Sequence, residues 1–221
     1  MNRIDTLPEV RLISITPDAQ HTIAYCARVS NPSNQDNDNI AGLLAYCARK
    51  EHWSIFEMAS AVLEIKTTRT VARQILRHRS FSFQEFSQRY GEVEEYSNAA
   101  ARRQDLKNRQ NSIDNLYDQD TQWWAETQRE VIELVESRYQ EALLRGIAKE
   151  CARAILPEGM TITRMYMNGT IRSWVTYLKT RLAGGTQKEH RDVAEKIADI
   201  FRLELPTVAE AFNNFEGDFL K

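Results

Sequence analysis

Five arginines lie close together between positions 69 and 89, a stretch that contains one acidic residue, Glu85, and no lysine. They are Arg69, Arg73, Arg77, Arg79 and Arg89. The first three are spaced four residues apart, so a helix would place them on one face, where like charges repel. A guanidinium group presents a planar fork of donors that suits two-point binding of phosphate or carboxylate. The spacing predicts either a solvated charged face, paired with distant acids, or an anion-binding site.

The second half of this stretch favours the anion-binding site. From Arg77 to Tyr90 the chain reads RHRSFSFQEFSQRY, which combines hydroxyls, amides, a carboxylate and aromatic rings without glycine or proline. A solvated face seldom mixes three phenylalanines with so many directional polar groups. Such groups can bind a phosphate and the edges of a nucleobase, while the rings stack on the base or form the wall of a pocket.

The same stretch resembles the signature of the flavin-dependent thymidylate synthases, which is Arg-His-Arg-x-x-Ser, four residues, Ser, one residue and Arg. Every signature position is present, at Arg77, His78, Arg79, Ser82, Ser87 and Arg89. A match over thirteen residues is far more specific than a lone glycine pattern.

Further pieces that resemble the family occur in the expected order from residue 27 to residue 212. Residues 52–57 imply that Ser54 touches the flavin and that His52 lies near the folate. Residues 71–74 imply a nucleotide-binding glutamine, and residues 151–157 imply an arginine that grips the nucleotide. Residues 170–174, then Arg181 and Gln187, resemble the flavin and substrate segment near the C-terminus. The chain departs from the usual residue types at Gln84, Thr170, Thr186 and His190.

The resemblance implies the reductive methylation of dUMP to dTMP. The carbon donor would be 5,10-methylenetetrahydrofolate, and FAD, reduced by NADPH, would carry the hydride. The family assembles as a homotetramer whose active sites are shared between subunits. No metal is implied, and the separations of His52, His78 and His190 match no metal-ligand spacing.

The resemblance also assigns roles to individual residues. Arg181 would be the catalytic residue, because a fixed guanidinium can stabilise uracil ionised at N3 and its adjacent carbonyl. The implied flavin-binding residues are Ser54, Arg77, His78, Arg79, Glu85, Thr170, Ile171, Arg172 and Thr176. The implied dUMP-binding residues are Gln74, Ile75, Leu76, Arg77, Glu85, Phe86, Ser87, Gln88, Arg89, Arg153 and Arg181.

Two nucleophilic mechanisms are less favoured by the sequence. The thiols of Cys26, Cys47 and Cys151 lack a neighbouring histidine or cationic pocket that the sequence can show. A serine nucleophile at Ser87 would need a general base, and no triad order is evident. We therefore expect Ser87 to donate to phosphate.

Two other function classes stay open. An RNA- or single-strand DNA-binding module could use the arginines with Phe81, Phe83, Phe86 and Tyr90 as stacking platforms, although a pI near 6.1 is unusual for such a module. The second class is a nucleotide-binding protein that has lost the reaction. The formal charge of -2 predicts neither a nucleic-acid nor a membrane partner.

The elements that must position these residues alternate along the chain. Apolar and β-branched runs predict strands over 10–15, 61–66 and 160–167. Helical periodicity predicts helices from about 16 to 28 and over 40–50, 67–78, 124–144, 147–155, 170–182 and 187–205, and residues 98–122 form a polar excursion with partial helix. We expect one domain over 1–221 of class α/β or α+β, with a central mixed or antiparallel sheet flanked by long helices. Lacking a signal peptide or an apolar span, the protein should be cytoplasmic.

Overall fold

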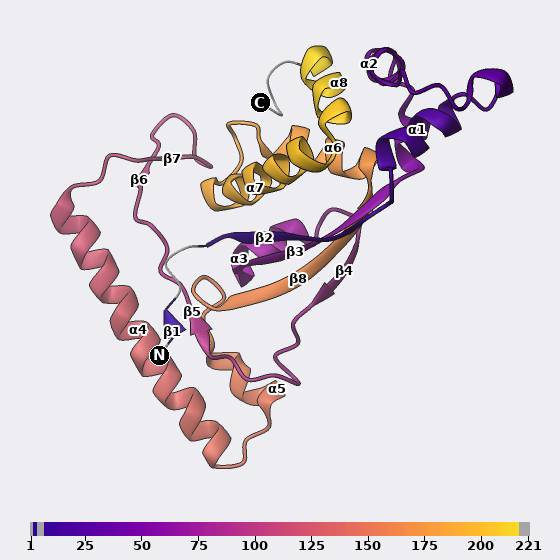
Figure 1. The fold of residues 1–221 in the computed structure, drawn as a ribbon. Coiled ribbons are helices and arrows are strands. Elements are labelled where there is room, and N and C mark those ends of the chain that lie inside the picture. The colour runs from indigo at the N-terminus through magenta and orange to yellow at the C-terminus, as the bar shows by residue number, and fades with distance from the viewer. Residues whose placement is uncertain (1, 4–6, 217–221) are drawn as a thin grey trace. The chain divides into compact units, whose positions relative to one another are not determined.

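The computed structural model describes residues 2–3 and 7–216 of the chain (Figure 1). The chain divides into two compact units. Unit 1 comprises residues 1–8, 66–76 and 85–165, and unit 2 comprises residues 9–65, 77–84 and 166–221. The expectation of a single domain stays a prediction.

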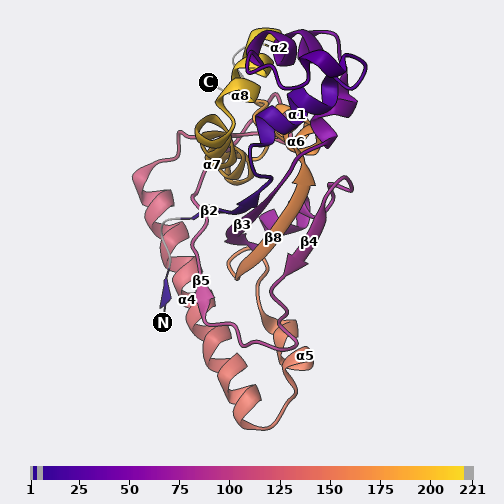
Figure 2. The same cartoon turned by 45° about the vertical axis from the view of Figure 1, so that its right-hand side comes forward.

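Unit 2 contains most of a four-stranded sheet, whose strands lie in the order β2, β3, β8 and β4 (Figure 2). The strands are β2 (Glu9–Ile15), β3 (Ser60–Thr68), β4 (Ser82–Glu85) and β8 (Ile162–Thr170). Along β3, buried side chains alternate with partly exposed ones, as expected for a strand with one face toward the core. The ends of β3 and β8 continue into unit 1.

Contacts between neighbouring strands show that the sheet is antiparallel. Thr16 N–H donates to Ser60 O at 2.9 Å, and Arg11 pairs with Glu64 at 3.2 Å. Residue numbers rise along β2 as they fall along β3, so these strands run in opposite directions. The other pairs are antiparallel too, which confirms the α+β class and selects the antiparallel alternative over a mixed sheet.

The helices of unit 2 cover this sheet and each other. Helix α7 packs along β2 and against α6, while α2 packs against α8. The helices are α1 (Ala19–Ala27), α2 (Ala41–Arg49), α6 (Ile171–Arg181), α7 (Lys188–Glu204) and α8 (Pro206–Glu216), with 3₁₀ turns η1 (Pro32–Asn34) and η2 (Trp53–Glu57). Helix α8 was not expected from the sequence. Pro206 both ends α7 and starts α8, because proline is tolerated in the first turn of a helix.

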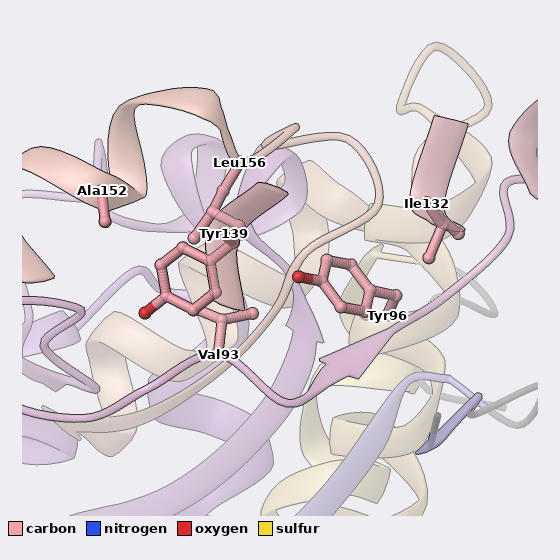
Figure 3. Close-up of a cluster of buried hydrophobic side chains, with 6 residues drawn as sticks. All are labelled: Val93, Tyr96, Ile132, Tyr139, Ala152 and Leu156. Atoms are coloured by element: carbon pink, nitrogen blue, oxygen red, sulfur yellow. The ribbon is translucent and has the colours of Figure 1, made fainter. Parts of the chain in front are cut away.

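Unit 1 is built around the 27-residue helix α4 (Asp118–Leu144). One side of α4 packs into a hydrophobic cluster that Figure 3 shows. The cluster contains Val93, Tyr96, Ile132, Tyr139, Ala152 and Leu156. Gly146, with φ of +79°, follows α4, and glycine adopts this left-handed conformation readily at the end of a helix.

The remaining elements of unit 1 are short. They are β1 (Asn2–Arg3), α3 (Arg69–Ile75), β5 (Glu95–Tyr96), β6 (Arg103–Gln104), β7 (Ser112–Ile113), α5 (Lys149–Ala152) and the 3₁₀ turn η3 (Arg153–Ile155). Strand β1 pairs with β5 in parallel, and β6 pairs with β7 antiparallel. The expected helix over 147–155 is therefore only one turn of α-helix followed by a 3₁₀ turn.

The polar segment 98–122 differs from its prediction in the same unit. It contains the β6–β7 hairpin rather than partial helix up to residue 113, and α4 begins at Asp118 instead of Trp124. Asp118 and Asp120 lie in the first turn of α4, where carboxylates favour the positive end of the helix dipole.

Among the described residues, no helix is long and apolar enough to cross a membrane.

Candidate active site

Helix α3 ends at Ile75, two residues before the signature begins. Arg77 therefore does not share a helix face with Arg69 and Arg73, and this prediction from spacing is wrong. The chain turns instead, with Phe81 N–H donating to His78 O at 3.3 Å. The turn brings the ring of Phe81 into the core of unit 2, where it is 9% exposed.

Arg69 and Arg73 are paired with carboxylates inside unit 1. Arg69 lies 3.4 Å from Glu85, and Arg73 lies 3.0 Å from Glu158. Thr163 also donates to Glu85, at 2.9 Å. Arg69 and Arg73 thus match the alternative in which acids distant in sequence neutralise the arginines. Their ion pairs link segments of unit 1.

Arg77 and Arg79 have the opposite character. Both side chains are exposed in unit 2, and neither has a hydrogen-bond or ion-pair partner in the part of the chain that the structure describes. Two exposed guanidinium groups without carboxylates are a donor set that fits a diphosphate.

One of the four aromatic rings that could stack on bases, that of Phe81, packs in the core of unit 2 instead. Phe81 lies edge-on to Trp174, with ring centroids 4.7 Å apart. A Cβ at Gly169 would overlap the Phe81 ring, so glycine is what lets β8 pass beside it. Phe86 and Tyr90 are exposed, but Phe81 is buried and therefore cannot stack on a nucleic-acid base. This weakens the nucleic-acid alternative.

Arg89 and Arg153 meet at one residue of unit 1, Glu150. Arg89 donates through Nε to Glu150 Oε2 at 3.1 Å, and Arg153 Nε donates to the backbone oxygen of Glu150 at 3.3 Å. Arg89, Tyr90, Ala148, Lys149 and Glu150 line a cavity of about 310 Å³. Arg89 is thus paired with a carboxylate of the chain itself, whereas Arg153 contacts only the backbone carbonyl of the same residue.

Gln88 precedes Arg89 in the sequence and has one buried polar atom without a hydrogen-bond partner among the described residues. Its side chain is 5% exposed, and its Nε2 has no hydrogen-bond acceptor among the described residues. A buried amide donor without a partner costs free energy unless a ligand or water accepts from it. Ser87, one residue earlier, accepts from Arg89 N–H at 3.3 Å.

Arg181 and His78 form a direct hydrogen bond in unit 2. Arg181 Nε–H donates to His78 Nε2 at 2.9 Å. Arg181 is half-buried, and its terminal nitrogens have no partner within the described ranges. The histidine therefore fixes the near end of the guanidinium and leaves its outer N–H groups available.

The charge state of His78 follows from its surroundings. Burial, together with the positive charges of Arg181 and Arg77, lowers the pKa of His78 to about 4. At neutral pH the ring is thus uncharged, and its bare Nε2 is free to accept from Arg181.

The N-terminus of α6 holds several of the implied flavin residues. Thr170 Oγ1 accepts from Ser173 N–H at 3.2 Å and caps the helix. Arg172 forms an ion pair with Glu57, and Thr176 donates to the backbone oxygen of Arg172 at 3.0 Å. The side chain of Arg172 is therefore engaged by a carboxylate of unit 2.

Two of the implied positions offer only backbone atoms. The side chains of Ile75 and Ile171 are fully buried, and Ile171 N–H already donates to Ala59 O at 2.9 Å. Gln74 and Leu76 are half-buried and Ser54 is exposed on η2.

The implied residues divide between the two units. Unit 2 carries Ser54, Arg77, His78, Arg79, Thr170, Ile171, Arg172, Thr176 and Arg181, which includes all of the implied flavin set except Glu85. Unit 1 carries Gln74, Ile75, Leu76, Glu85, Phe86, Ser87, Gln88, Arg89 and Arg153, which is the implied dUMP set except Arg77 and Arg181.

Sequence reasoning did not predict the contacts of four residues that surround the candidate ones. Glu150 binds Arg89 and Glu158 binds Arg73, across 61 and 85 residues of sequence. Tyr177 and His190 pack beside His78. A signal existed for Tyr177, which lies one helical turn before Arg181 on α6.

The three cysteines differ in their exposure. All three are free thiols, but only Cys47 is buried, while Cys26 is intermediate and Cys151 is exposed. Burial raises the pKa of the Cys47 thiol.

Comparison with known proteins gives a consistent family. The model of the thymidylate synthase complementing protein family matches residues 11–207. The flavin-dependent thymidylate synthase of a Synechocystis strain is 52% identical, over 93% of this chain and 95% of the relative. A probable flavin-dependent thymidylate synthase of Paramecium bursaria Chlorella virus 1 is 51% identical, over 92% and 98%.

A solved structure agrees with these sequences. The UMP/dUMP methylase PolB from Streptomyces cacaoi, bound with 5-Br dUMP, superposes with a TM-score of 0.87 at 25% identity, covering 99% of each chain. With the signature intact and this similarity over nearly its whole length, the chain belongs to the family of flavin-dependent thymidylate synthases.

Proposed function

We propose that this protein converts dUMP to dTMP, with methylenetetrahydrofolate as the carbon donor and with FAD, reduced by NADPH, as the hydride source. Family membership and the dUMP-methylase neighbour support the reaction class. The observation that carries the proposal is the hydrogen bond between Arg181 and the signature histidine, His78. It joins two segments about a hundred residues apart in sequence and presents one guanidinium in a fixed orientation.

FAD fits the donor set of unit 2. Arg77 and Arg79 would bind its diphosphate, because both guanidinium groups are exposed and unpaired among the described residues. Ser54, Thr170 and Thr176 would add hydroxyl or backbone contacts, with His78 and Ile171 nearby. Arg172 would have to leave Glu57 to reach the flavin. The bound flavin would supply hydride transfer, and the protein would bind and orient it.

The nucleotide fits the residues of unit 1. Arg89 and Arg153 would hold the phosphate of dUMP, which would replace Glu150 as the partner of Arg89. Ser87 would donate its hydroxyl to the phosphate, and the unpartnered amide of Gln88 would donate to the nucleotide. Gln74, Glu85 and the backbone of residues 75, 76 and 86 would complete the site.

Arg181 would activate the uracil ring. Its terminal N–H groups are donors in a partly buried position, where they can stabilise negative charge that develops at N3 and the adjacent carbonyl. That charge makes the ring carbon nucleophilic toward the one-carbon unit. His78, neutral at pH 7, holds the guanidinium without competing for the base.

Assembly and location complete the proposal. The protein would form a homotetramer in the cytoplasm, with active sites shared between subunits. Sharing is reasonable because pockets for FAD, dUMP and a folate together are large for a chain of 221 residues. Residues of the two units need not then come from the same chain.

The visible absorption spectrum tests this proposal directly. Protein purified without added cofactor is saturated with FAD and then titrated with dUMP. We expect a flavin spectrum that dUMP perturbs, followed by dTMP formation when the folate and NADPH are added. Arg77→Gln should lower the flavin content, whereas the matched control Arg11→Gln, whose partner is Glu64 on β3, should not.

Three results would separate the alternatives. Flavin binding without turnover would favour a nucleotide-binding protein that has lost the reaction. No flavin binding, together with RNA or single-strand DNA binding that falls steeply with salt, would favour the nucleic-acid module. Loss of flavin in both variants would mean that Arg77 has no specific part in binding.

A further inference from the structure

Helices α6 and α7 bring two buried polar side chains together behind the signature histidine. The hydroxyl of Tyr177 lies 3.0 Å from Nε2 of His190. Tyr177 is 1% exposed and His190 is fully buried. No role in the proposed reaction has been given to either residue, and neither side chain can touch a ligand from the surface.

The pair continues to Arg181 through His78. The rings of Tyr177 and His78 meet edge to face, with centroids 4.9 Å apart, and the His190 ring lies 6.3 Å from that of His78. His78 then accepts the hydrogen bond from Arg181 at 2.9 Å. All four residues belong to unit 2, so one continuous set of contacts runs from α7 to the guanidinium.

We propose that His190 is a positioning residue for Arg181. Its hydrogen bond fixes the hydroxyl end of Tyr177, the Tyr177 ring fixes the plane of His78, and His78 sets the orientation of the Arg181 guanidinium. The inference rests on the proposed function, because the consequence of misplacing Arg181 is a slower reaction with dUMP.

The cost of leaving the buried Tyr177 hydroxyl unpaired favours a positioning role for His190 over simple core packing. Trp174 and Phe81 line the same core with apolar surface, so an apolar side chain at position 190 would satisfy packing alone. A buried hydroxyl that loses its hydrogen-bond partner destabilises the fold, so the Tyr177 ring would shift to recover one. The hydrogen bond thus selects one ring position among several that pack equally well.

The charges around the set keep it in one state at neutral pH. His78 and His190 both face the Arg181 guanidinium, and His78 also faces Arg77. Burial, the positive charge of Arg181 and the neighbouring His78 lower the pKa of His190 to about 3, so both rings are neutral at pH 7. Each ring then has one bare nitrogen, and on His78 that nitrogen is the one facing Arg181.

Substitutions at position 190 test the proposal. His190→Leu removes the hydrogen bond, while His190→Gln places an amide where Nε2 was. We expect His190→Leu to lower kcat for dTMP formation by roughly tenfold to a hundredfold, because a displacement of about 1 Å can cost that much, with the KM for dUMP nearly unchanged. His190→Gln should restore most of the rate. His21→Leu, on the exposed surface of α1, is the matched control.

A second variant reaches the same hydrogen bond from its other end. Tyr177→Phe should reproduce the loss of kcat, and combining it with His190→Leu should add little, since the two act through one bond. Flavin content and thermal midpoint show which variants fold. Full kcat in a folded His190→Leu, or additive losses in the double variant, would overturn the proposal.

A measurement independent of turnover separates this inference from the proposed function. Nitrogen NMR of the histidine rings reports which nitrogen of His78 is bare and whether it accepts from Arg181. His190→Leu should change the Nε2 resonance of His78, and His190→Gln should not. If the wild-type protein forms no dTMP, the proposed function fails while this result still decides the positioning role. An unchanged resonance with normal turnover would refute the positioning role alone.

Discussion

At the scale of single residues, the arginines between positions 69 and 89 differ in the partners of their side chains. Arg73 binds Glu158 and Arg89 binds Glu150, while Arg77 and Arg79 face solvent. Their spacing could not predict this, because the partner acids come from segments 85 and 61 residues away. That the region binds an anionic ligand stays a prediction from its residue types.

Arg89 gives the first prediction. Arg89→Lys keeps the charge but removes the planar fork of N–H donors. We expect the KM for dUMP to rise about tenfold with kcat little changed, since phosphate binding contributes equally to the ground and transition states. Steady-state kinetics at varied dUMP measure both constants. An unchanged KM, or a fall in kcat alone, would remove Arg89 from the phosphate site.

The histidines behind Arg181 give a prediction about pH. The pKa of His78 is lowered to about 4 and that of His190 to about 3, so between these values and about 6.5 the unfolded chain binds more protons than the folded chain. The free energy of unfolding should therefore fall as the pH is lowered from about 6.5 toward 4. Urea midpoints across this range test it, with His190→Gln as the comparison. Equal slopes for both proteins would mean that His190 contributes nothing.

At the scale of elements, periodicity predicted the long helices and strands but not the short ones. The bounds of α6 and α7 agree with expectation within one residue, because buried side chains repeat at helical spacing over several turns. The two-residue strands β5, β6 and β7 carry no such period. The sequence predicts a helix over 67–78, because Arg77 fits the helical spacing. Helix α3 ends at Ile75 instead, since the chain turns there and buries Phe81.

Two glycines give a matched prediction at this scale. Gly146 has φ of +79°, and Gly42 lies in α2; a Cβ at either would meet nothing within 4 Å. Gly146→Ala should lower the free energy of unfolding by about 1 kcal/mol through backbone strain, while Gly42→Ala should raise it by roughly 0.5–1 kcal/mol. Denaturant unfolding of both variants compares them. Stabilisation by Gly146→Ala would contradict the assigned backbone conformation.

At the scale of the whole molecule, a near-neutral chain carries a local concentration of arginine between positions 69 and 89. The formal charge is -2, yet both implied ligands, FAD and dUMP, are anions. Local arginine clusters reconcile the two facts.

The assembly itself can be measured. We expect sedimentation equilibrium to give a mass near four times 25.6 kDa, since the proposed sites are shared between subunits. Mixing inactive Arg181→Gln with inactive Arg89→Ala chains should then restore part of the activity, if the two residues act from different subunits. A monomer with full activity would contradict shared sites.

The rate of dTMP formation by the wild-type protein and by Arg181→Gln tests the central claim most directly. With dUMP, methylenetetrahydrofolate, FAD and NADPH supplied, the wild type should form dTMP. The variant should be slower by about 10²–10³-fold while still binding FAD and dUMP, because it lacks the charge that stabilises the ionised uracil. No dTMP from a wild-type protein that binds both ligands, or an equal rate in the variant, would contradict the account.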